Sequence, residues 1–517
     1  MSEIFLYTTK KTENTKLNVW CAFPAVYNFG MSALGYLSVF QHIDSIDGIY
    51  AERIFTDTEK TNIQFKDVDI ITFSFSFELD YLGILNIMDK YNIPFLAQER
   101  REEQPLIYAG GPVVSANPEP FAEFFDFIMI GDAEPHIEEI FNILKNNKEK
   151  RKKEKLQLLS NIEGVYVPTL KDDNYEVKKV SSKLNKCVST PILTENSFFP
   201  NTFVIEVERG CPQNCGFCLT SYINNPVRFC SYEEIINKID TAIKYTNKIA
   251  LLGALICAHP KIDDICRYIT DKVNSGIPLE VTVSSLRADY VSDTTLEMLH
   301  KCGQRTATIA VEAGSERLRN VINKNLSDSD ILSVVDKMVK HGFTGLKMYG
   351  IIGLPTETYE DLDSFVELCK TIKKKHKTFI LTPSFSTFVP KAHTPFEFSR
   401  REATKTLEKK NEYIKKQFAK IGIKARTGSV KWDYIQSLLS RGSGELTPYL
   451  IDVYKNGGNI GAFKNIYKEY EKACKLPSSD KFATEEFSYF EKFPWDFIKY
   501  SKTKQQLKAE YDKLLAQ

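Results

Sequence analysis

Residues 201–398 alternate between short apolar segments and amphipathic segments of helical length, and this alternation constrains the fold more than any other feature. Six apolar segments are strand candidates: Thr202–Val207, Lys248–Leu252, Leu279–Val283, Thr306–Val311, Gly345–Ile351 and Phe379–Phe388. Strands that alternate with helices form parallel sheets, because each helix carries the chain back to the same end of the sheet. The pattern predicts a partial (β/α)6 barrel of the TIM type, with its chemistry at the carboxyl ends of the strands.

Three cysteines lie within eight residues directly after the first candidate strand, at Cys211, Cys215 and Cys218. An odd and tight group of thiols indicates a metal centre and not a set of disulfide bonds. A structural zinc site takes four ligands, and the nearest histidines, His136 and His259, are far along the chain. Three thiolates that hold an iron–sulfur cube leave one iron open to another ligand.

Two neighbours of this loop bear on the metal centre. Cys230 lies 12 residues beyond Cys218 and is either a fourth ligand or, as we favour, a buried and inert thiol. Arg209 precedes the loop, and its positive charge is expected to favour the deprotonated thiols.

Residues 1–150 show a second alternation of strand and helix, which predicts a doubly wound, Rossmann-like parallel sheet. Ligands of such sheets bind beyond the carboxyl ends of the strands. Gly110, Gly111 and Gly131 follow two of these candidate strands. These glycines either let the backbone approach a large flat ligand or only form tight turns.

Between and after these regions the pattern changes. Residues 151–200 are a predicted linker, with a β-hairpin between Gly164–Val167 and Tyr175–Val180. Residues 399–517 are rich in lysine and in helical periodicity, which predicts a helical C-terminal cap on the barrel. The expected domains are therefore 1–150, 201–398 and 399–517.

Composition and charge bear on the partners and on the cellular location that the sequence predicts. The 68 Lys and Arg residues nearly balance the 67 Asp and Glu residues, so no excess charge favours nucleic acid as a partner. No apolar run is long enough to span a bilayer, and residues 1–20 lack the pattern of a secretory signal. The expected location is the cytoplasm.

The cysteine loop resembles that of the radical S-adenosylmethionine (SAM) superfamily, both in its Cys-x3-Cys-x2-Cys spacing and in Phe217 before the last cysteine. Four later segments, each after a candidate strand, resemble the family in the right order: Gly253, Ser284-Ser285-Leu286-Arg287, Val311-Glu312-Ala313-Gly314-Ser315-Glu316-Arg317 and Gly350-Ile351-Ile352-Gly353-Leu354-Pro355-Thr356-Glu357-Thr358. In the last segment, Thr356 stands where the family commonly has glycine. The resemblance covers about residues 200–400.

The resemblance implies that Cys211, Cys215 and Cys218 hold a [4Fe–4S] cluster whose fourth iron binds SAM. Reductive cleavage of SAM then gives a 5′-deoxyadenosyl radical, which abstracts a hydrogen atom from the substrate. The resemblance also implies SAM-binding roles in the matching segments, for Phe217, Gly253, Ser284, Ser285, Arg287, Glu312 and Gly353. The expected partners are a small-molecule or peptide substrate and an electron donor such as flavodoxin or ferredoxin.

The N-terminal region resembles the cobalamin-binding domain that is joined to many radical SAM enzymes, through Phe73-Ser74-Phe75-Ser76, Gly110-Gly111-Pro112 and Phe127–Glu134. This implies that cobalamin binds at Ser74, Ser76, Gly110, Gly111 and Gly131, and that the reaction is methyl transfer to carbon. The family's Asp-x-His-x-x-Gly motif is absent, and His42 is the only histidine before His136. Either the cobalt lacks a histidine from this domain, or the domain has lost cobalamin.

Other interpretations stay open. Lys391 and His393, in the segment that closes the sixth strand, either face the substrate or belong to a rigid loop that holds the cap. A methylthiotransferase acting on tRNA or protein shares the cysteine loop but adds an N-terminal domain with three more cluster cysteines, and residues 1–200 contain only Cys21 and Cys187. A non-enzymatic binding module stabilised by a metal is the third hypothesis.

Overall fold

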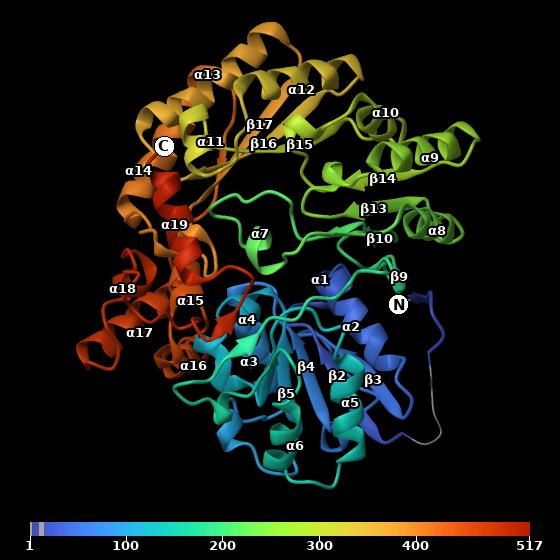
Figure 1. Ribbon diagram of the computed structural model, residues 1–517, viewed down its shortest axis with the longest axis vertical. Helices are drawn as coiled ribbons and strands as arrows, with labels where there is room; N and C mark the ends of the chain where they lie inside the picture. Colours follow the sequence, from blue (N-terminus) through green and yellow to red (C-terminus); the bar gives the residue numbers. More distant parts are fainter. Residues whose placement is uncertain (1–2, 10–14) are drawn as a thin grey trace.

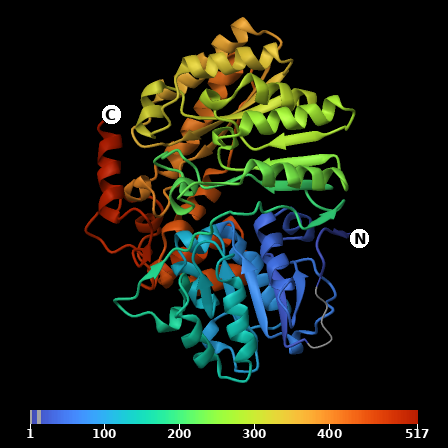
Figure 2. The same ribbon diagram turned by 45° about the vertical axis from the view of Figure 1, so that its right-hand side comes forward.

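The computed structural model describes residues 3–9 and 15–517. Figures 1 and 2 show an N-terminal sheet and a β/α barrel stacked one above the other, with the C-terminal helices along one side of both. Part of the segment 1–20, for which no secretory signal is expected, lies outside the described residues. Among the described residues, no helix is long and apolar enough to cross a membrane.

Five parallel strands form the N-terminal sheet, and a sixth strand extends it in the antiparallel sense. The strands are β2 (Leu17–Ala22), β3 (Ile49–Ile54), β4 (Ile70–Ser74), β5 (Leu106–Gly110), β6 (Phe127–Met129) and β7 (Val165–Tyr166). Their order, β3-β2-β4-β5-β6-β7, is that of a doubly wound sheet whose winding reverses between β2 and β4. The predicted sheet is confirmed, and it reaches past residue 150 because β7 pairs with β6.

Helices cover both faces of this sheet, because alternate residues of each strand point to opposite sides. On one face, Val19 packs in a core with α2 (Leu34–Asp44) and α5 (Ile137–Asn146). On the other face, Trp20 packs in a second core with α3 (Tyr81–Lys90). The carboxyl ends of the strands are left to face the barrel, and Figure 1 shows them pointing toward it.

Six parallel strands form the barrel in the predicted order: β10 (Thr202–Glu206), β13 (Lys248–Leu252), β14 (Glu280–Val283), β15 (Thr306–Glu312), β16 (Gly345–Ile352) and β17 (Ile380–Thr387). They form two hydrogen-bonded groups, which a parallel bridge between Leu286 and Ile309 joins. A short strand, β18 (Arg426–Thr427), continues the second group. In the described part of the chain β10 pairs with neither β17 nor β18, so this edge is open, as in a partial barrel.

Serine side chains cap several of the crossover helices at their first turn. Ser231, Ser292 and Ser327 each accept a hydrogen bond from the backbone N–H three residues on, which satisfies a donor that the helix itself leaves free. The crossover helices are α8 (Tyr232–Ile243), α9 (Ile262–Asn274), α10 (Asp293–Lys301), α11 (Glu316–Val321), α12 (Asp328–Lys340) and α13 (Tyr359–Lys375).

The C-terminal helices pack on the barrel and on the N-terminal sheet. They are α14 (Thr404–Lys420), α15 (Val430–Arg441), α16 (Thr447–Lys455), α17 (Ile460–Lys472), α18 (Ser479–Ala483) and α19 (Lys504–Leu515). Leu407 and Phe418 of α14 are buried in the barrel core. Phe463 of α17 instead meets Tyr81 of α3, with ring centroids 6.3 Å apart. The predicted cap therefore also bridges the two α/β units.

The predicted hairpin at residues 164–180 is wrong. β7 pairs with β6, whereas β8 (Val177–Lys178) pairs in parallel with β19 (Ile498–Lys499). Two short apolar segments with a turn between them satisfy a hairpin pattern locally, but each finds a partner far away in the sequence.

Lys391 joins the N-terminal sheet to the C-terminal helices. It forms an ion pair with Glu78, a buried residue that follows β4. Glu78 also accepts hydrogen bonds from Ser440 Oγ (2.7 Å) and Gln436 Nε2 (3.0 Å). His393 is buried in the same loop, with its ring 4.3 Å from that of Tyr500. These contacts support the interpretation of this segment as a rigid loop that holds the cap.

We expect Lys391→Met to destabilise the protein by about 3–5 kcal/mol, because it leaves the Glu78 carboxylate buried without its cation. Urea unfolding followed by circular dichroism measures this. The double variant Glu78→Gln/Lys391→Met removes both charges and should recover more than half of the loss. Equal losses in the single and double variants would show that the pairing of the charges does not matter.

Candidate active site

The cysteine loop leaves the barrel at the carboxyl end of β10, between the short strand β11 (Glu208–Arg209) and α7 (Leu219–Ile223). Cys215 is buried, and Cys211 and Cys218 are half-buried. All three are free thiols, and each lies near enough to another to influence its charge. Phe217 packs against the apolar core beside them. The structure therefore brings the three predicted ligands together.

Other elements fix the backbone of this loop. Gly216 N donates to Ile322 O (3.0 Å), and Gly216 O accepts from Phe396 N (3.1 Å). The side chain of Asn323 donates to Asn214 O (2.7 Å). A Cβ atom on Gly216 would lie 2.9 Å from Leu514 Cδ1 of α19, so the loop and this helix pack closely here. The C-terminal helix covers the outer side of the loop.

Charged groups gather beside Cys215. Arg287 is buried, with Nε hydrogen-bonded to Asp289 (2.8 Å), whereas its Nη1 has no hydrogen-bond partner. The Glu312 carboxylate at the end of β15 lies 3.5 Å from Lys324 Nζ. Burial raises the pKa of Glu312, and Lys324 acts against this rise. Sequence reasoning missed Lys324, which follows α11.

The other residues predicted to bind SAM lie at the ends of their strands. Ser284 Oγ donates to Gly253 O (2.9 Å), so β13 and β14 meet there. Ser285 is half-buried next to it. Gly353 has a φ of +85°, and a Cβ there would lie 2.4 Å from Leu407 Cδ2 of α14. The structure gives Gly353 a packing role against α14.

Glu208 is a second residue that sequence reasoning missed. Its side chain is 2% exposed; Oε1 accepts from the backbone N–H of Leu255, and Oε2 has no hydrogen-bond partner. Burial raises the pKa of Glu208 to about 7, although the N–H groups of Leu255 and Ala254 act in the other direction. It directly precedes Arg209 at the edge of the cysteine loop.

The donor set fits an iron–sulfur cluster. Three buried or half-buried thiols lie on one loop, and a cube takes one thiolate on each of three irons. Burial raises the pKa of Cys215 to about 12, with Lys324 acting against it. Coordination to a metal overcomes this preference for the protonated thiol.

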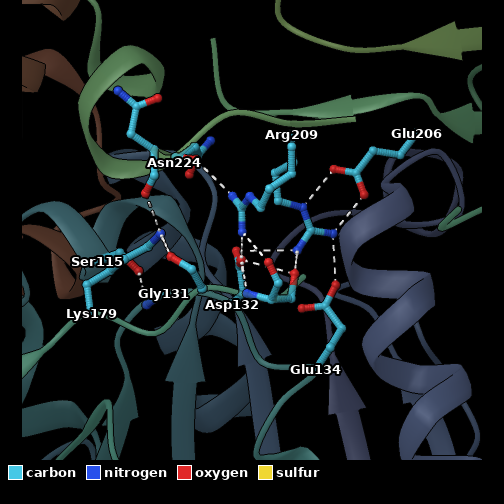
Figure 3. A network of polar contacts seen from close by, with 12 residues as sticks. Ser115, Gly131, Asp132, Glu134, Lys179, Glu206, Arg209 and Asn224 are labelled. Atoms are coloured by element: carbon cyan, nitrogen blue, oxygen red, sulfur yellow. Dashed lines mark hydrogen bonds and ion pairs between the residues drawn. The ribbon is translucent and has the colours of Figure 1, made fainter. Parts of the chain in front are cut away.

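Cys230 and Arg209 have partners other than the three cysteines. Cys230 is buried, its Sγ donates to Glu206 O (3.1 Å), and Cys187 lies beside it. The expectation that Arg209 favours the thiolates is wrong. Figure 3 shows its guanidinium directed to carboxylates, at 2.7 Å from Glu206 and 2.8 Å from Glu134. Those carboxylates neutralise its charge.

The cysteine hairpin is formed by the two short strands on either side of the cysteine loop, Glu208–Arg209 and Arg228–Phe229. Arg209 belongs to an ion-pair network that joins this hairpin to the N-terminal sheet (Figure 3). Asp132, just after β6, lies 3.3 Å from Arg209 Nη1 and 2.6 Å from Arg228 Nη1 on the neighbouring strand β12 (Arg228–Phe229). Burial opposes the charge of Asp132, but Arg209 and Arg228 outweigh it and hold its pKa below the ordinary value. The cysteine hairpin is thereby fixed to the sheet below it.

The residues predicted to bind cobalamin lie at the carboxyl edge of the N-terminal sheet, in two different settings. Gly111 and Gly131 have φ of +128° and +100°, and a Cβ on them would lie 2.4 Å from Phe75 O and 2.3 Å from Val180 O. Both therefore form tight turns against the protein's own backbone. Ser74 and Gly110 are half-buried and Ser76 is exposed, as are the neighbouring Phe77 and Pro112.

His42, the histidine that precedes His136 in the sequence, does not face this edge. It is on α2, and its Nδ1 contacts Ser38 O (2.8 Å) within the same helix. The edge itself carries the exposed side chains of Ser76, Phe77 and Pro112.

Comparisons with known proteins agree with this site. The family model for the N-terminal part of radical SAM proteins matches residues 35–168, and that for the radical SAM superfamily matches residues 205–369. The uncharacterized protein MJ0966 of Methanocaldococcus jannaschii is 30% identical over 446 residues, 85% of this chain and 91% of that protein. The uncharacterized methyltransferase PH0819 of Pyrococcus horikoshii is 23% identical over 364 residues, 65% and 72% of the two chains. A tRNA-2-methylthio-N(6)-dimethylallyladenosine synthase of Pelagibacter ubique is 22% identical over 308 residues, 55% and 61% of the two chains.

Two solved structures share the fold. The radical SAM methyltransferase TsrM of Kitasatospora setae, with cobalamin and a [4Fe–4S] cluster bound, has a TM-score of 0.51 at 12% identity, over 89% of this chain and 100% of that one. The cobalamin-dependent SAM radical enzyme OxsB, with aqua-cobalamin and SAM bound, has a TM-score of 0.54 at 15% identity, over 89% of this chain and 71% of that one. The combination of N-terminal sheet and barrel is thus a known arrangement.

Asp132→Asn should destabilise the protein by about 2–4 kcal/mol in urea unfolding at neutral pH, because the half-buried Arg228 loses the carboxylate that balances it. Asp264→Asn is the matched control. Asp264 pairs with Arg267 at the exposed surface of α9, so its loss should leave stability unchanged within error.

A comparison of the wild type with Asp132→Asn at different pH values tests whether the loss of stability is electrostatic in origin. A carboxylate whose folded pKa is lowered contributes its full stability above its unfolded pKa and loses it as the pH falls through the folded pKa. The difference in the free energy of unfolding between the wild type and Asp132→Asn should stay constant from about pH 6 to 8 and shrink below about pH 4. A difference that does not shrink in acid would assign the effect to packing.

Proposed function

The chain belongs to the radical SAM superfamily, and on this premise we propose that it cleaves SAM reductively, abstracts a hydrogen atom from its substrate and transfers a methyl group to carbon with the help of cobalamin. One observation carries the proposal. Three free thiols gather at the carboxyl end of an open barrel, beside a buried arginine, Arg287, with an unpartnered N–H donor.

When a [4Fe–4S] cluster and SAM are bound, they supply the electron that cleaves the sulfonium bond and the 5′-deoxyadenosyl radical that takes a hydrogen atom. Cys211, Cys215 and Cys218 would hold the cluster. Arg287 Nη1 is free to bind a carboxylate. The cover formed by α19 and Phe396 limits access of water to the loop, which protects a reactive radical.

The other predicted contacts with SAM are part of the proposal. Phe217 packs beside the cysteines, and Ser284 and Ser285 follow β14 on the same face of the barrel. Glu312, which lies beside Lys324, follows β15. Hydroxyl and carboxylate groups suit the hydrogen-bond donors and acceptors of a ribose and an amino acid.

Cobalamin, which supplies a carrier for the methyl group, is proposed to bind over the edge formed by Ser76, Phe77, Gly110 and Pro112. The name of the Pyrococcus horikoshii relative and the fold shared with TsrM and OxsB support methyl transfer. Ser76, Phe77, Gly110 and Pro112 would hold the ring of the cofactor, and His42 would not supply a ligand to cobalt, because its Nδ1 contacts Ser38 O of its own helix.

The proposal also covers the cellular location, the electron donor, the substrate and the functional units of the enzyme. All eleven cysteines are free thiols, which suits the reducing cytoplasm. A small reduced protein of the flavodoxin or ferredoxin type is the proposed electron donor. The substrate is proposed to be a small molecule or a peptide. We propose functional units at residues 1–150, 201–398 and 399–517, joined by the linker 151–200.

A methylthiotransferase is less well supported. The match to the Pelagibacter ubique enzyme covers 55% of this chain. Within residues 1–200 the two cysteines, Cys21 and Cys187, are both buried, so the three exposed thiols of a second cluster are not available there. In place of an RNA-binding β-domain, the C-terminal region is helical.

The test is anaerobic reconstitution with iron and sulfide. We expect about four irons per chain in the wild type and a large loss of iron in Cys218→Ser. Cys230→Ser should keep the full iron content, because that buried thiol lies outside the loop. With SAM and a reductant, the wild type should form 5′-deoxyadenosine and, with corrinoid bound, S-adenosylhomocysteine.

Each result has a contrary outcome. Equal loss of iron in both cysteine variants would reject the assigned ligands. Absence of 5′-deoxyadenosine from protein with a complete cluster would reject the radical step. A visible spectrum of anaerobically purified protein without corrinoid bands, together with no S-adenosylhomocysteine after cobalamin is added, would reject methyl transfer.

A further inference from the structure

The inner face of the barrel carries polar side chains that neither the cysteine loop nor the cobalamin edge uses. Along β16, Leu346 and Met348 are buried in the barrel core, where Met348 Sδ lies 3.7 Å from Cys369 Sγ of α13. Figure 1 shows α12 and α13 on the outer side of these strands. Successive side chains of a strand point to opposite faces, so Lys347 and Tyr349 point into the barrel. This face is open to solvent, because Tyr349 is 36% exposed although strands pair on both sides of it.

The register of three strands places two hydroxyl groups beside Lys347. Thr308 on β15 and Thr382 on β17 are its pairing partners on either side. Neighbouring strands lie about 4.8 Å apart, so the ammonium group and both hydroxyls can reach one ligand group. Lys347 Nζ donates to Tyr349 OH (3.0 Å). The hydroxyls of Thr308 and Thr382 have no hydrogen-bond partner among residues 3–9 and 15–517.

A second row of inner residues lies two positions nearer to the carboxyl ends of the strands. Tyr349 pairs with Ser384 of β17, and Ser384 pairs with Arg426 of β18. Phe385, the next residue of β17, packs on Phe418 in the barrel core with ring centroids 5.9 Å apart, so Ser384 and Arg426 share the inner face. Arg426 is exposed and has neither a hydrogen bond nor an ion pair in the described part of the chain. The two rows therefore combine two cations with several hydroxyl groups.

No acid of the described residues forms an ion pair with Lys347 or Arg426. The acids on the inner faces of the barrel strands each have a different cation beside them: Glu312 has Lys324 (3.5 Å), Glu206 has Arg209 (2.7 Å), and Glu280 has Lys248 as its neighbour on the next strand. The positive charge on β16 and β18 is therefore in excess. An open face with excess positive charge and free hydroxyl donors suits an anion.

We propose that these two basic rows bind a phosphate monoester group of the substrate. The basic rows are formed by Thr308, Lys347, Tyr349, Thr382, Ser384 and Arg426. This inference rests on the proposed function and adds the chemical class of the substrate to it. A phosphate monoester carries three strong acceptor oxygens, one more than a carboxylate. An ammonium group, a guanidinium fork and a set of hydroxyls together supply the donors that these oxygens need.

The position of the basic rows also indicates the length of the substrate. Tyr349 and Lys347 lie three and five residues before Ile352, the last residue of β16. At about 3.3 Å per residue, the phosphate lies roughly 10–17 Å from the carboxyl edge of the strands, where the cysteine loop begins. The phosphate and the reacting carbon are therefore at opposite ends of an elongated substrate. Binding energy from such a remote group can position the reacting carbon.

The experiment measures the binding of phenyl phosphate, benzoate and benzyl alcohol to cluster-loaded protein by anaerobic equilibrium dialysis. SAM is present at saturation, so its own site is occupied. Phenyl phosphate should bind more tightly than the other two probes. Lys347→Met should weaken its binding roughly 10- to 100-fold, as for a lost hydrogen bond between charged groups. Lys340→Met is the matched control, because Lys340 is exposed on α12, and it should leave the affinity within about 2-fold.

A second pair of variants tests a hydroxyl without changing the charge. Thr382→Val keeps the shape of the side chain and should weaken the binding of phenyl phosphate roughly 3- to 10-fold, as for a lost neutral hydrogen bond. Thr282→Val makes the same change on the inner face of β14, in the other half of the barrel, and should leave the affinity within about 2-fold. Circular dichroism melting curves check that each variant is folded.

Chemical labelling places the bound phosphate on the protein. The wild type is acetylated with an N-hydroxysuccinimide ester, and mass spectrometry measures the rate at each lysine. Phenyl phosphate should slow the acetylation of Lys347, whereas the rate at Lys340 should not change. Slowing at both lysines to the same extent, or at neither, would count against the basic rows.

The outcomes separate the phosphate site from the proposed function. Wild-type protein with a complete cluster that forms no 5′-deoxyadenosine rejects the proposed function, whatever its affinity for phenyl phosphate. Protein that cleaves SAM but binds phenyl phosphate no more tightly than benzoate or benzyl alcohol rejects the basic rows as a phosphate site. Equal binding by the wild type and Lys347→Met rejects them as well. If Lys347→Met does not fold, the comparison of Thr382→Val with Thr282→Val decides.

Discussion

The loop that carries the three cysteines is the constraint on which the rest of the structure depends. Such a loop is too short to bury its own apolar surface, and its backbone groups need partners. It obtains them from Ile322 after α11 and from Phe396 before the C-terminal helices, while Leu514 of α19 packs on Gly216. Three segments that are distant in sequence must therefore be in place before the thiols have defined positions.

Glu208 and Arg209 show how one short strand serves two purposes. Successive side chains of a strand point to opposite sides. Glu208 is directed to the turn after β13 and the cysteines, whereas Arg209 is directed to the carboxylates of the N-terminal sheet. The same two residues thus define the cofactor side of the hairpin and fix its other side to the sheet. A change of register by one residue would exchange these roles.

Much of the fold can be predicted from the sequence. The spacing of apolar residues is a local signal, and the strands follow one another in a regular order along the chain. The six barrel strands have the expected bounds within one residue at each end. The cysteine ligands follow from their spacing alone. Lys324 and Glu208 could not be found in this way, since their importance comes from burial and from neighbours across the barrel. The hairpin at residues 164–180 failed for the same reason: β8 pairs with β19, more than 300 residues away.

The place of α19 in the chain has a consequence for the making of the protein. Its residues are synthesised about 290 residues after the cysteine loop that they cover. At about 5–20 residues per second, the loop emerges roughly 15–60 s before its cover exists. Proteins that deliver iron and sulfide during translation therefore reach an uncovered cysteine loop. Proteins that deliver them later must first displace α19. The order in which the segments are made sets a window for cofactor delivery.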